Sequence, residues 1–414
     1  MATRPHYIDE NRGRDAGKLQ DVRPRHEFLR VFPSLKARES ARKTRSPLLR
    51  AENTSKLKAG FIYVGPVSDF GWNRAHDEGR KLAEKALPWL ETTFVESVPE
   101  SEVESSVDQM ARDGVKVVFA NSFGYSDGIL AAAKQHPDMI FAHATGFRRA
   151  PNVATYNQNF YQPHYLVGLI AGALSKTGKV GYVGAVPTTE IKCYANAYAL
   201  GVQAANPKAK VLIRFTNSWY SPPAAKEATE SLIAEGADAF CYSESSPTVI
   251  LTAAEHKLIS FSHYSPMHHL APDYVASGYL VHWDKSYIDF LTKVHNGEYT
   301  PKNLQNVDFF GLLDQGGVTL GAKEGMVFNP LYVDRLKAAT ITDPVLGKMS
   351  AYDFILKRLA QMTDPKRTFD PFDGPLSDRK GVQRVAAKAR LGRDGLDKME
   401  WAAPALIGPW PNEP

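Results

Sequence analysis

The chain has 414 residues, of which 43% are hydrophobic and 11% aromatic. This is the composition of a folded globular protein that is long enough for two domains. No run approaches about 18 consecutive apolar residues, which excludes a transmembrane helix. The two cysteines, Cys193 and Cys241, lie in apolar periodic segments. Two buried thiols are favoured, a single bridge is the less favoured alternative, and a disulfide framework is excluded.

The net charge of +5 comes from the N-terminal arm, residues 1–57. The arm holds 14 Lys and Arg against seven Asp and Glu, which leaves −2 for the rest of the chain. A basic arm is able to bind nucleic acid or an acidic membrane surface, but a solvated or partner-docked tail is the favoured interpretation. No nucleic acid is therefore expected. A regulatory or structural protein whose arm holds a homo-oligomer is a further hypothesis.

The arm lacks the features of an export signal. Its apolar clusters at residues 28–29 and 31–32 are far shorter than the core of about 7–15 residues that a secretory signal needs, and it contains no twin-arginine pair. As numbered, the chain is expected in the cytoplasm.

From residue 57 onward, short apolar runs alternate with amphipathic stretches. In the first half, the pattern predicts strands at 60–64, 92–95, 115–120, 139–142 and 153–156, and helices at 72–90, 102–112 and 127–136. In the second half, it predicts strands at 179–183, 210–215, 239–242, 258–262 and 274–281, and helices at 188–205, 224–235, 246–256 and 285–296. The apolar segment 157–175 is predicted to be helical and to cross between the two halves.

Strands that alternate with helices form parallel sheets. We therefore predict an α/β fold of two doubly wound, Rossmann-like lobes. The expected limits are an arm at 1–57, a first lobe at 58–160 with a return segment near 283–330, a second lobe at 161–282, and C-terminal segments at 331–414 that cover the lobes.

Polar and aromatic side chains gather directly after the predicted strands, where open α/β sheets bind their ligands. The turn after the first strand, VGPVSDFGWN (64–73), contains neither GxGxxG nor GxxxxGK[ST]. It indicates a flat, mostly neutral ligand held by stacking, and not a phosphate cradle. The candidate ligand-binding residues are Ser68, Asp69, Trp72, Asn73, Phe123, Tyr125, Asn157, Phe160, Tyr194, Asn196, Trp219, Glu244, His263, His282 and Trp283.

Several of these candidates have structural alternatives. Trp72 is equally well explained as an anchor that holds its helix on the sheet. Ser68 or Asn73 is also a good helix N-cap. Tyr194 and Tyr198 are four residues apart on a predicted helix, so both fit a core position.

Metal and hydrolase chemistry are weakly supported. His263, His268 and His269 lie close in sequence, but no HExxH or CxxC motif stands near them. No GxSxG or SxxK motif occurs either. No metal and no cofactor are expected.

Several long segments, in one order, carry a resemblance to a known family. They are VGPVSDFGWNRAHDEGR (64–80), ANSFGYSDGIL (120–130), HATGFRRAPNVATYNQNFYQPHYLVGLIAGALSKTGKVGYVG (143–184), ANAYALGVQAANP (195–207) and NSWYSPPAAKEA (217–228). PFDGPLSD (371–378) and LDKMEW (396–401) look like the family's ending. The chain resembles the basic membrane protein family of substrate-binding proteins, which includes purine nucleoside receptors of ABC importers.

The resemblance implies a type I periplasmic-binding-protein fold, with two lobes joined by three crossovers and the ligand in the cleft. It implies that aromatics at Trp72 and near Tyr194 sandwich a base, with Asn73 beside them. An ABC permease is the implied partner. Family members are normally exported or lipid-anchored, so the resemblance implies a periplasmic location, whereas this chain has no lipobox cysteine.

The second lobe departs from the family's nucleoside-binding pattern. That pattern has acidic residues and a lysine at the strand ends, where this chain has His263 and His282, with Glu244 in a turn that is usually Gly-rich. A purine-like base is therefore expected more than an intact nucleoside. The first hypothesis is a non-enzymatic binding protein that closes over this ligand. The alternative is a cytosolic hydrolase or lyase acting on a heterocycle, with Glu244, His263 and His282 as acid and base.

Overall fold

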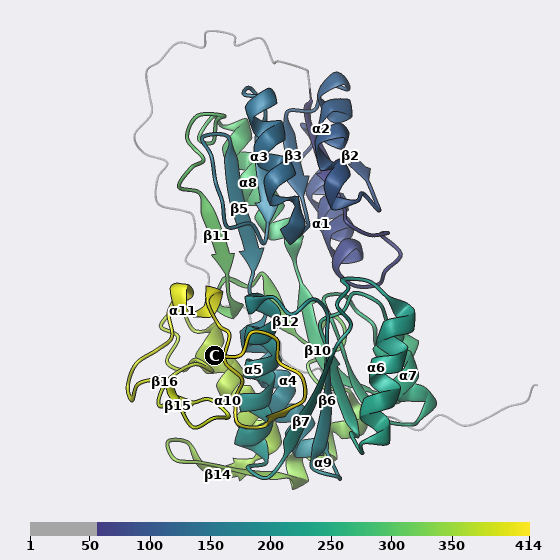
Figure 1. The fold of residues 1–414 in the computed structure, drawn as a ribbon, viewed down its shortest axis with the longest axis vertical. Helices are drawn as coiled ribbons and strands as arrows, with labels where there is room; N and C mark the ends of the chain where they lie inside the picture. Colours follow the sequence, from purple (N-terminus) through teal and green to yellow (C-terminus); the bar gives the residue numbers. More distant parts are fainter. Residues whose placement is uncertain (1–55) are drawn as a thin grey trace, which may run out of the picture. The chain divides into compact units, whose positions relative to one another are not determined.

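Two predominantly parallel sheets, each covered by helices, organise the part of the chain that the computed structural model describes, residues 56–414 (Figure 1). The expectations for the basic arm fall on residues 1–55 and lie almost entirely outside this range. The predicted α/β class and the two doubly wound lobes are confirmed.

The first lobe is built on a six-stranded sheet with the order β2-β1-β3-β4-β5-β11. All of its neighbouring strands are parallel. Its strands are β1 (Leu57–Ile62), β2 (Leu90–Val95), β3 (Val117–Ala120), β4 (Ile140–Ala144), β5 (Val153–Gln158) and β11 (Asp308–Gly311). Its helices are α1 (Trp72–Ala86), η1 (Glu100–Glu102), α2 (Val103–Arg112), η2 (Phe123–Tyr125), α3 (Ser126–Gln135) and α8 (Trp283–His295).

The second lobe repeats this strand order in a seven-stranded sheet, β17-β7-β6-β8-β9-β10-β12, in which β12 is antiparallel. Its strands are β6 (Lys179–Gly184), β7 (Lys210–Phe215), β8 (Ala239–Tyr242), β9 (Ile259–Ser262), β10 (Val275–Val281), β12 (Val318–Leu320) and β17 (Leu406–Ile407). Its helices include α4 (Tyr161–Leu174), α5 (Thr189–Ala205), α6 (Pro222–Ala234), α7 (Thr248–Glu255) and η3 (His268–Leu270). In each lobe the strand order reverses beside the first strand, which is where open sheets bind ligands.

The described chain passes between the two sheets three times, as the resemblance implied. The passages follow β5, follow β10, and connect β11 to β12. The predicted return segment 283–330 is therefore too long, because β12 already belongs to the second sheet. The predicted helix at 157–175 begins only at Tyr161, because residues 157 and 158 complete β5.

Small residues allow α4 to pack closely against α5 inside the second lobe. A Cβ atom added at Gly168 would stand 2.2 Å from the carbonyl oxygen of Tyr198, and one at Gly201 would stand 2.1 Å from that of Tyr165. The backbones of the two helices therefore touch at these positions. This contact fixes α5, whose first turns face the cleft.

Two helix ends are determined by proline and differ from the ends that the hydrophobic periodicity predicts. The helix predicted at 72–90 ends at Ala86, because Leu87 precedes Pro88 and adopts an extended conformation. Helix α6 begins at Pro222, two residues before its predicted start, because proline suits the first helical position.

The C-terminal residues wrap the second lobe. Asn196, on α5, donates a hydrogen bond of 2.8 Å to the carbonyl oxygen of Trp401 and accepts one of 2.7 Å from the Ala403 N–H. The elements from the third crossover onward are η4 (Leu313–Gln315), α9 (Pro330–Ala338), β13 (Thr340–Asp343), β14 (Gly347–Ser350), α10 (Ala351–Thr363), β15 (Leu376–Ser377), β16 (Gln383–Val385) and α11 (Arg393–Asp397).

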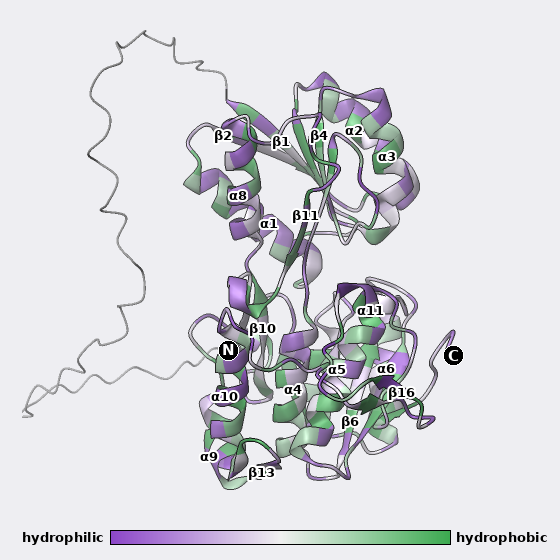
Figure 2. Ribbon diagram, turned by 90° about the vertical axis from the view of Figure 1, so that its left-hand side faces the viewer, coloured by the Kyte–Doolittle hydropathy of each residue, from purple (hydrophilic) through white to green (hydrophobic). Residues whose placement is uncertain are grey.

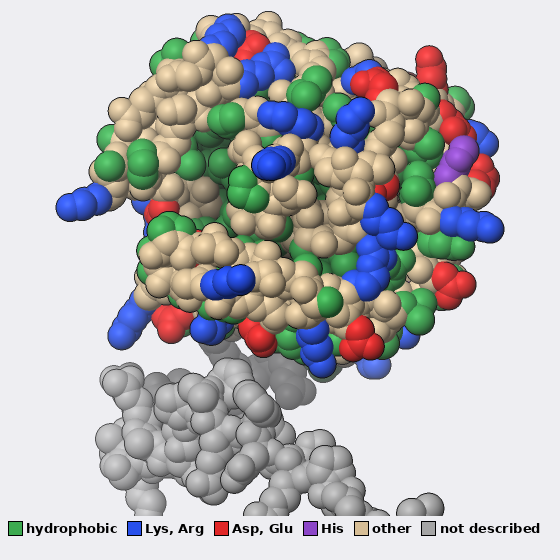
Figure 3. Space-filling view, turned by 90° about the horizontal axis from the view of Figure 1, so that it is seen from below, with side chains coloured by type: hydrophobic (Ala, Val, Ile, Leu, Met, Phe, Trp, Pro, Cys, Tyr) green, Lys and Arg blue, Asp and Glu red, His purple; other side chains and the backbone are tan. Residues whose placement is uncertain are grey.

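The distribution of apolar residues follows the layers of sheets and helices. The central strands are largely green in Figure 2, while α2, α3 and α8 mix polar and apolar residues. Figure 3 shows charged side chains of both signs interspersed over the end of the second lobe that carries α9 and β14.

Within residues 56–414 no helix combines the length and apolarity of a membrane span. Cys193 and Cys241 are buried free thiols, as predicted.

Candidate functional site

A cavity of about 560 Å³ lies at the carboxyl ends of the strands of both lobes. The first lobe contributes residues that follow β1, β2, β3 and β4, namely Val64, Gly65, Pro66, Trp72, Asn73, Ser97, Asn121, Ser122, Phe123 and Thr145. The second lobe contributes residues that follow β6, β7, β8 and β9, namely Glu190, Ile191, Tyr194, Ser218, Trp219, Tyr220, Ser243, Ser245 and Tyr264.

A network of amides and one carboxylate shapes the first-lobe wall. The buried Asp69 accepts hydrogen bonds from the backbone N–H groups of Gly71, Asn73 and Arg74 and from the Asn73 amide. It thus caps α1 from a position upstream of the helix. Burial raises the pKa of Asp69, and these hydrogen bonds oppose the rise. Asn73 in turn accepts a bond of 2.9 Å from the Asn121 amide, which ties the β1 and β3 ends together.

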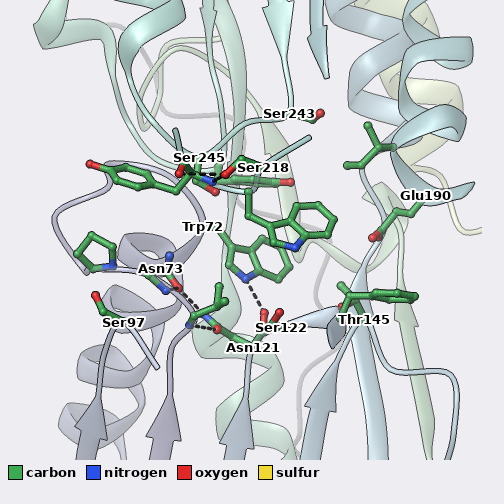
Figure 4. Close-up of a pocket in the computed structure, with 18 of the residues that line it drawn as sticks. Trp72, Asn73, Ser97, Asn121, Ser122, Thr145, Glu190, Ser218, Ser243 and Ser245 are labelled. Carbon is green, nitrogen blue, oxygen red and sulfur yellow. Dashed lines mark hydrogen bonds between the residues drawn. The ribbon is translucent and has the colours of Figure 1, made fainter. Parts of the chain in front are cut away.

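Trp72 begins α1 and reaches across the same wall. Its indole N–H donates a hydrogen bond of 2.7 Å to the Asn121 carbonyl oxygen, drawn as a dashed line in Figure 4. Its ring meets those of Trp283 and Tyr264 edge to face, with centroid distances of 5.4 Å and 5.2 Å. Aromatic packing and this bond hold the indole orientation while the side chain borders the cavity.

Glu190 and Tyr194 enter from the first turns of α5. The Tyr194 hydroxyl and the Asn157 amide both donate to Oε1 of Glu190, at 2.5 Å and 2.6 Å. Burial raises the pKa of Glu190, and these two bonds oppose the rise. Figure 4 shows the Glu190 carboxylate directed toward the space beside Trp72. Tyr194 stacks on His164 at a centroid distance of 4.9 Å, which fixes the tyrosine ring.

Backbone strain concentrates around the cavity. Ser97, Thr145 and Tyr264 line it and have positive φ angles of 56°, 57° and 64°. Such non-glycine conformations cost about 1–3 kcal/mol each and recur at ligand sites. Tight packing holds Tyr264 in this conformation, with its ring centroid 4.9 Å from that of Phe160.

Trp72, Asn73, Phe123, Tyr194 and Trp219 are the five predicted residues that line the cavity. In particular, Trp72 and Tyr194 share one cavity. The remaining candidates do not line it.

Seven of those remaining candidates support the cavity or lie away from it. Ser68 is exposed, and Asp69 acts through Asn73. Tyr125 bonds the Val98 carbonyl oxygen within the first-lobe core. Asn157 holds Glu190, and Asn196 holds the C-terminal segment. Phe160 and Trp283 are fully buried behind Trp72.

The three residues of the enzyme alternative also lie outside the cavity lining. Both carboxylate oxygens of Glu244 are occupied, by the Ser221 N–H and by the N–H and hydroxyl of Ser246. His263 is buried and shares a hydrogen bond of 2.5 Å with the Tyr279 hydroxyl. His282 bonds the Thr319 hydroxyl at the second crossover. The prediction that places Glu244, His263 and His282 in the cavity is therefore wrong.

Glu190, Asn121 and Tyr264 line the cavity but were not among the candidates. Each follows a predicted strand, so their positions in the sequence could have identified them as candidates. The sequence does not show whether each of these side chains points into the cavity. Glu190 is the single charged residue in the lining that residues 56–414 form. Over the same range, no group of three or more His, Cys, Asp or Glu side chains is arranged to hold a metal ion.

Two comparisons with known proteins agree on this architecture. Residues 56–344 match the family model described as "ABC transporter substrate-binding protein PnrA-like". The chain is 34% identical over 342 residues to a purine-binding protein of Brucella abortus (strain 2308), covering 81% of this chain and 89% of that protein.

Two further relatives are more distant. A Haloferax volcanii protein, provisionally named as an ABC transporter glucose-binding protein, is 33% identical over 243 residues, covering 59% of this chain and 62% of its own length. A solved ABC transporter solute-binding protein from Aeropyrum pernix K1 has a TM-score of 0.60 at 17% identity, covering 75% of this chain and 92% of that chain. The last likeness shows the fold. The family match, which spans most of the described residues, shows that the chain belongs to the PnrA-like ABC transporter substrate-binding proteins.

Proposed function

We propose that the chain is the receptor of an ABC importer for a planar nitrogen heterocycle, and that a purine base is its ligand. Membership of the substrate-binding family implies a small-molecule ligand and a permease as partners. The identity of the ligand is the part that we infer.

The observation that carries the proposal is the meeting of aromatic rings from both lobes in one cavity. Trp72 comes from the first lobe, and Tyr194, Trp219 and Tyr264 come from the second. A flat ring is the ligand that such walls hold best, because stacking adds about 0.5–1.5 kcal/mol to the gain from burial. Closure of the lobes would bring both sets of rings onto the ligand.

The polar groups of the lining favour a base over a sugar. Ser122, Thr145 and Ser218 already donate their hydroxyls to Glu100, Ala144 and Tyr220. A monosaccharide would bury several hydroxyls, each of which costs about 1–3 kcal/mol if it stays unpaired. A heterocycle with few polar groups buries fewer donors and acceptors that need a hydrogen-bond partner. The purine-binding relative supports the same ligand class.

The proposal is tested by identifying the small molecules that copurify with the full chain, using mass spectrometry, and by a thermal-shift panel of purine bases, nucleosides and glucose. A purine base should be released from the protein and should raise its melting temperature. Stabilisation by glucose but by no purine would contradict the proposal.

A further inference from the structure

Glu190 has one carboxylate oxygen that no donor within residues 56–414 reaches. Its Oε1 accepts both the Tyr194 hydroxyl and the Asn157 amide, whereas Oε2 accepts no hydrogen bond within residues 56–414. The neighbouring Oδ1 of Asn157 is also buried and without a partner in that range. Two hydrogen-bonded neighbours, Glu190 of the cavity lining and Asn157 behind it, thus each have one acceptor that lacks a donor in the described part of the chain.

We propose that Glu190 determines the specificity of the cavity by selecting a planar ring that carries an exocyclic amino group, and by excluding phosphorylated forms of that ring. The inference deepens the proposed function and rests on it. An aminopurine such as adenine carries this amino group, whereas 6-methylpurine has nearly the same shape and lacks it.

The charge of the lining supports this selection. Glu190 is the single charged residue in the lining formed by the described residues, so a bound phosphate would meet a carboxylate and no cation. An N–H donor, in contrast, would form a charge-assisted hydrogen bond with Oε2, which is stronger than a neutral one.

Both lobes set the position of the carboxylate. Tyr194 lies on α5 with Glu190, in the second lobe, while Asn157 belongs to β5 of the first lobe. The hydrogen bond from Asn157 therefore joins the lobes at this edge of the cavity. A ligand that bonds Glu190 would strengthen an existing link between the lobes, so that recognition and closure depend on one side chain.

The experiment titrates adenine, 6-methylpurine and adenosine monophosphate, by calorimetry, into the full-length wild type, Glu190→Gln and the control Glu227→Gln. Glu227 is exposed on α6 and does not line the cavity. The wild type and the control should bind adenine about 10-fold to 100-fold more tightly than 6-methylpurine, and adenosine monophosphate should not bind. Glu190→Gln should remove most of the preference for adenine.

The wild-type comparison of the two bases needs no variant, so it stands even if Glu190→Gln folds poorly. Equal affinity for adenine and 6-methylpurine would overturn the inference while leaving the proposed function intact. Tight binding of adenosine monophosphate, or an unchanged preference in Glu190→Gln, would do the same. Failure of both bases to bind the wild type would instead overturn the proposed function.

Discussion

Gly71 of the first lobe lies directly against Ser245 of the second: a Cβ atom at position 71 would stand 2.4 Å from the Ser245 carbonyl oxygen. The Ser265 hydroxyl also donates a hydrogen bond of 3.3 Å to the Gly71 carbonyl oxygen. The lobes therefore meet through backbone at the residue that precedes Trp72, the first residue of α1.

This contact predicts the effect of Gly71→Ala. The added methyl group cannot fit unless the lobes move apart, and overpacking of this kind costs about 1–3 kcal/mol. We expect ligand affinity to fall by about 5-fold to 100-fold, with a larger radius of gyration in X-ray scattering. Gly392→Ala is the control, because no atom of the described residues lies within 4 Å of a Cβ there. Unchanged affinity in Gly71→Ala would show that the contact is irrelevant to binding.

Trp72→Ala tests the aromatic wall. Stacking of a base on an aromatic side chain contributes about 1–3 kcal/mol, so affinity for a purine base should fall by about 10-fold to 100-fold. Trp89→Ala removes an indole that stacks on His295 at 4.0 Å and does not line the cavity, so it should leave affinity unchanged. Calorimetry of both variants decides between the ligand-binding and helix-anchoring interpretations of Trp72: a loss of stability without a loss of affinity supports the anchor alone.

Asn196→Ala should destabilise the protein. The amide is fully buried and binds the Trp401 carbonyl oxygen and the Ala403 N–H. Loss of these bonds leaves buried backbone groups unpaired, at about 1–3 kcal/mol each. Chemical denaturation should show this loss, while the affinity of the folded protein changes by less than about 3-fold. A large affinity loss at unchanged stability would return Asn196 to the ligand-binding residues.

His164 predicts a pH dependence of stability. Burial lowers its pKa from 6.5 to about 4, and its ring nitrogens bond the Phe160 carbonyl oxygen and the Tyr182 hydroxyl. A histidine with a depressed pKa in the folded state stabilises above its unfolded pKa, and this contribution is lost as the pH falls through 6.5 toward 4. The loss should reach about 3 kcal/mol for this residue.

The measurement is the free energy of unfolding from pH 7 to pH 4, in the wild type and in His164→Gln. The variant cannot take up this proton, so its curve should be flatter by that amount. Parallel curves would show that His164 titrates normally.

The sequence predicted the layers of this fold well because parallel strands are buried on both faces and stand out as apolar runs. The four C-terminal residues of β1 are all buried, for example. Helix ends were predicted less well where proline decides them, as at Ala86 and Pro222. The start of α1 at Trp72 was predicted correctly, although its capping residue, Asp69, lies outside the usual N-cap position.

The site was only partly predictable for a related reason. Glu190 and Glu244 both follow second-lobe strands, and that position alone does not distinguish them. The difference arises in three dimensions. Ser221 and Ser246 surround Glu244 with donors, whereas Asn157 reaches Glu190 from the other lobe and bonds one oxygen, and the other has no donor among the residues that the structure describes. The contacts from Ser221 and Asn157 join residues 23 and 33 positions apart in the chain, so periodicity and motifs carry no record of them.

Isothermal titration of adenine into the full chain, with glucose as the competing solute, tests the central claim most directly. One adenine should bind per chain with the same affinity in the presence and absence of excess glucose. Binding of glucose in its place, or heat that survives Trp72→Ala undiminished, would contradict a heterocycle held between the aromatic walls of the two lobes.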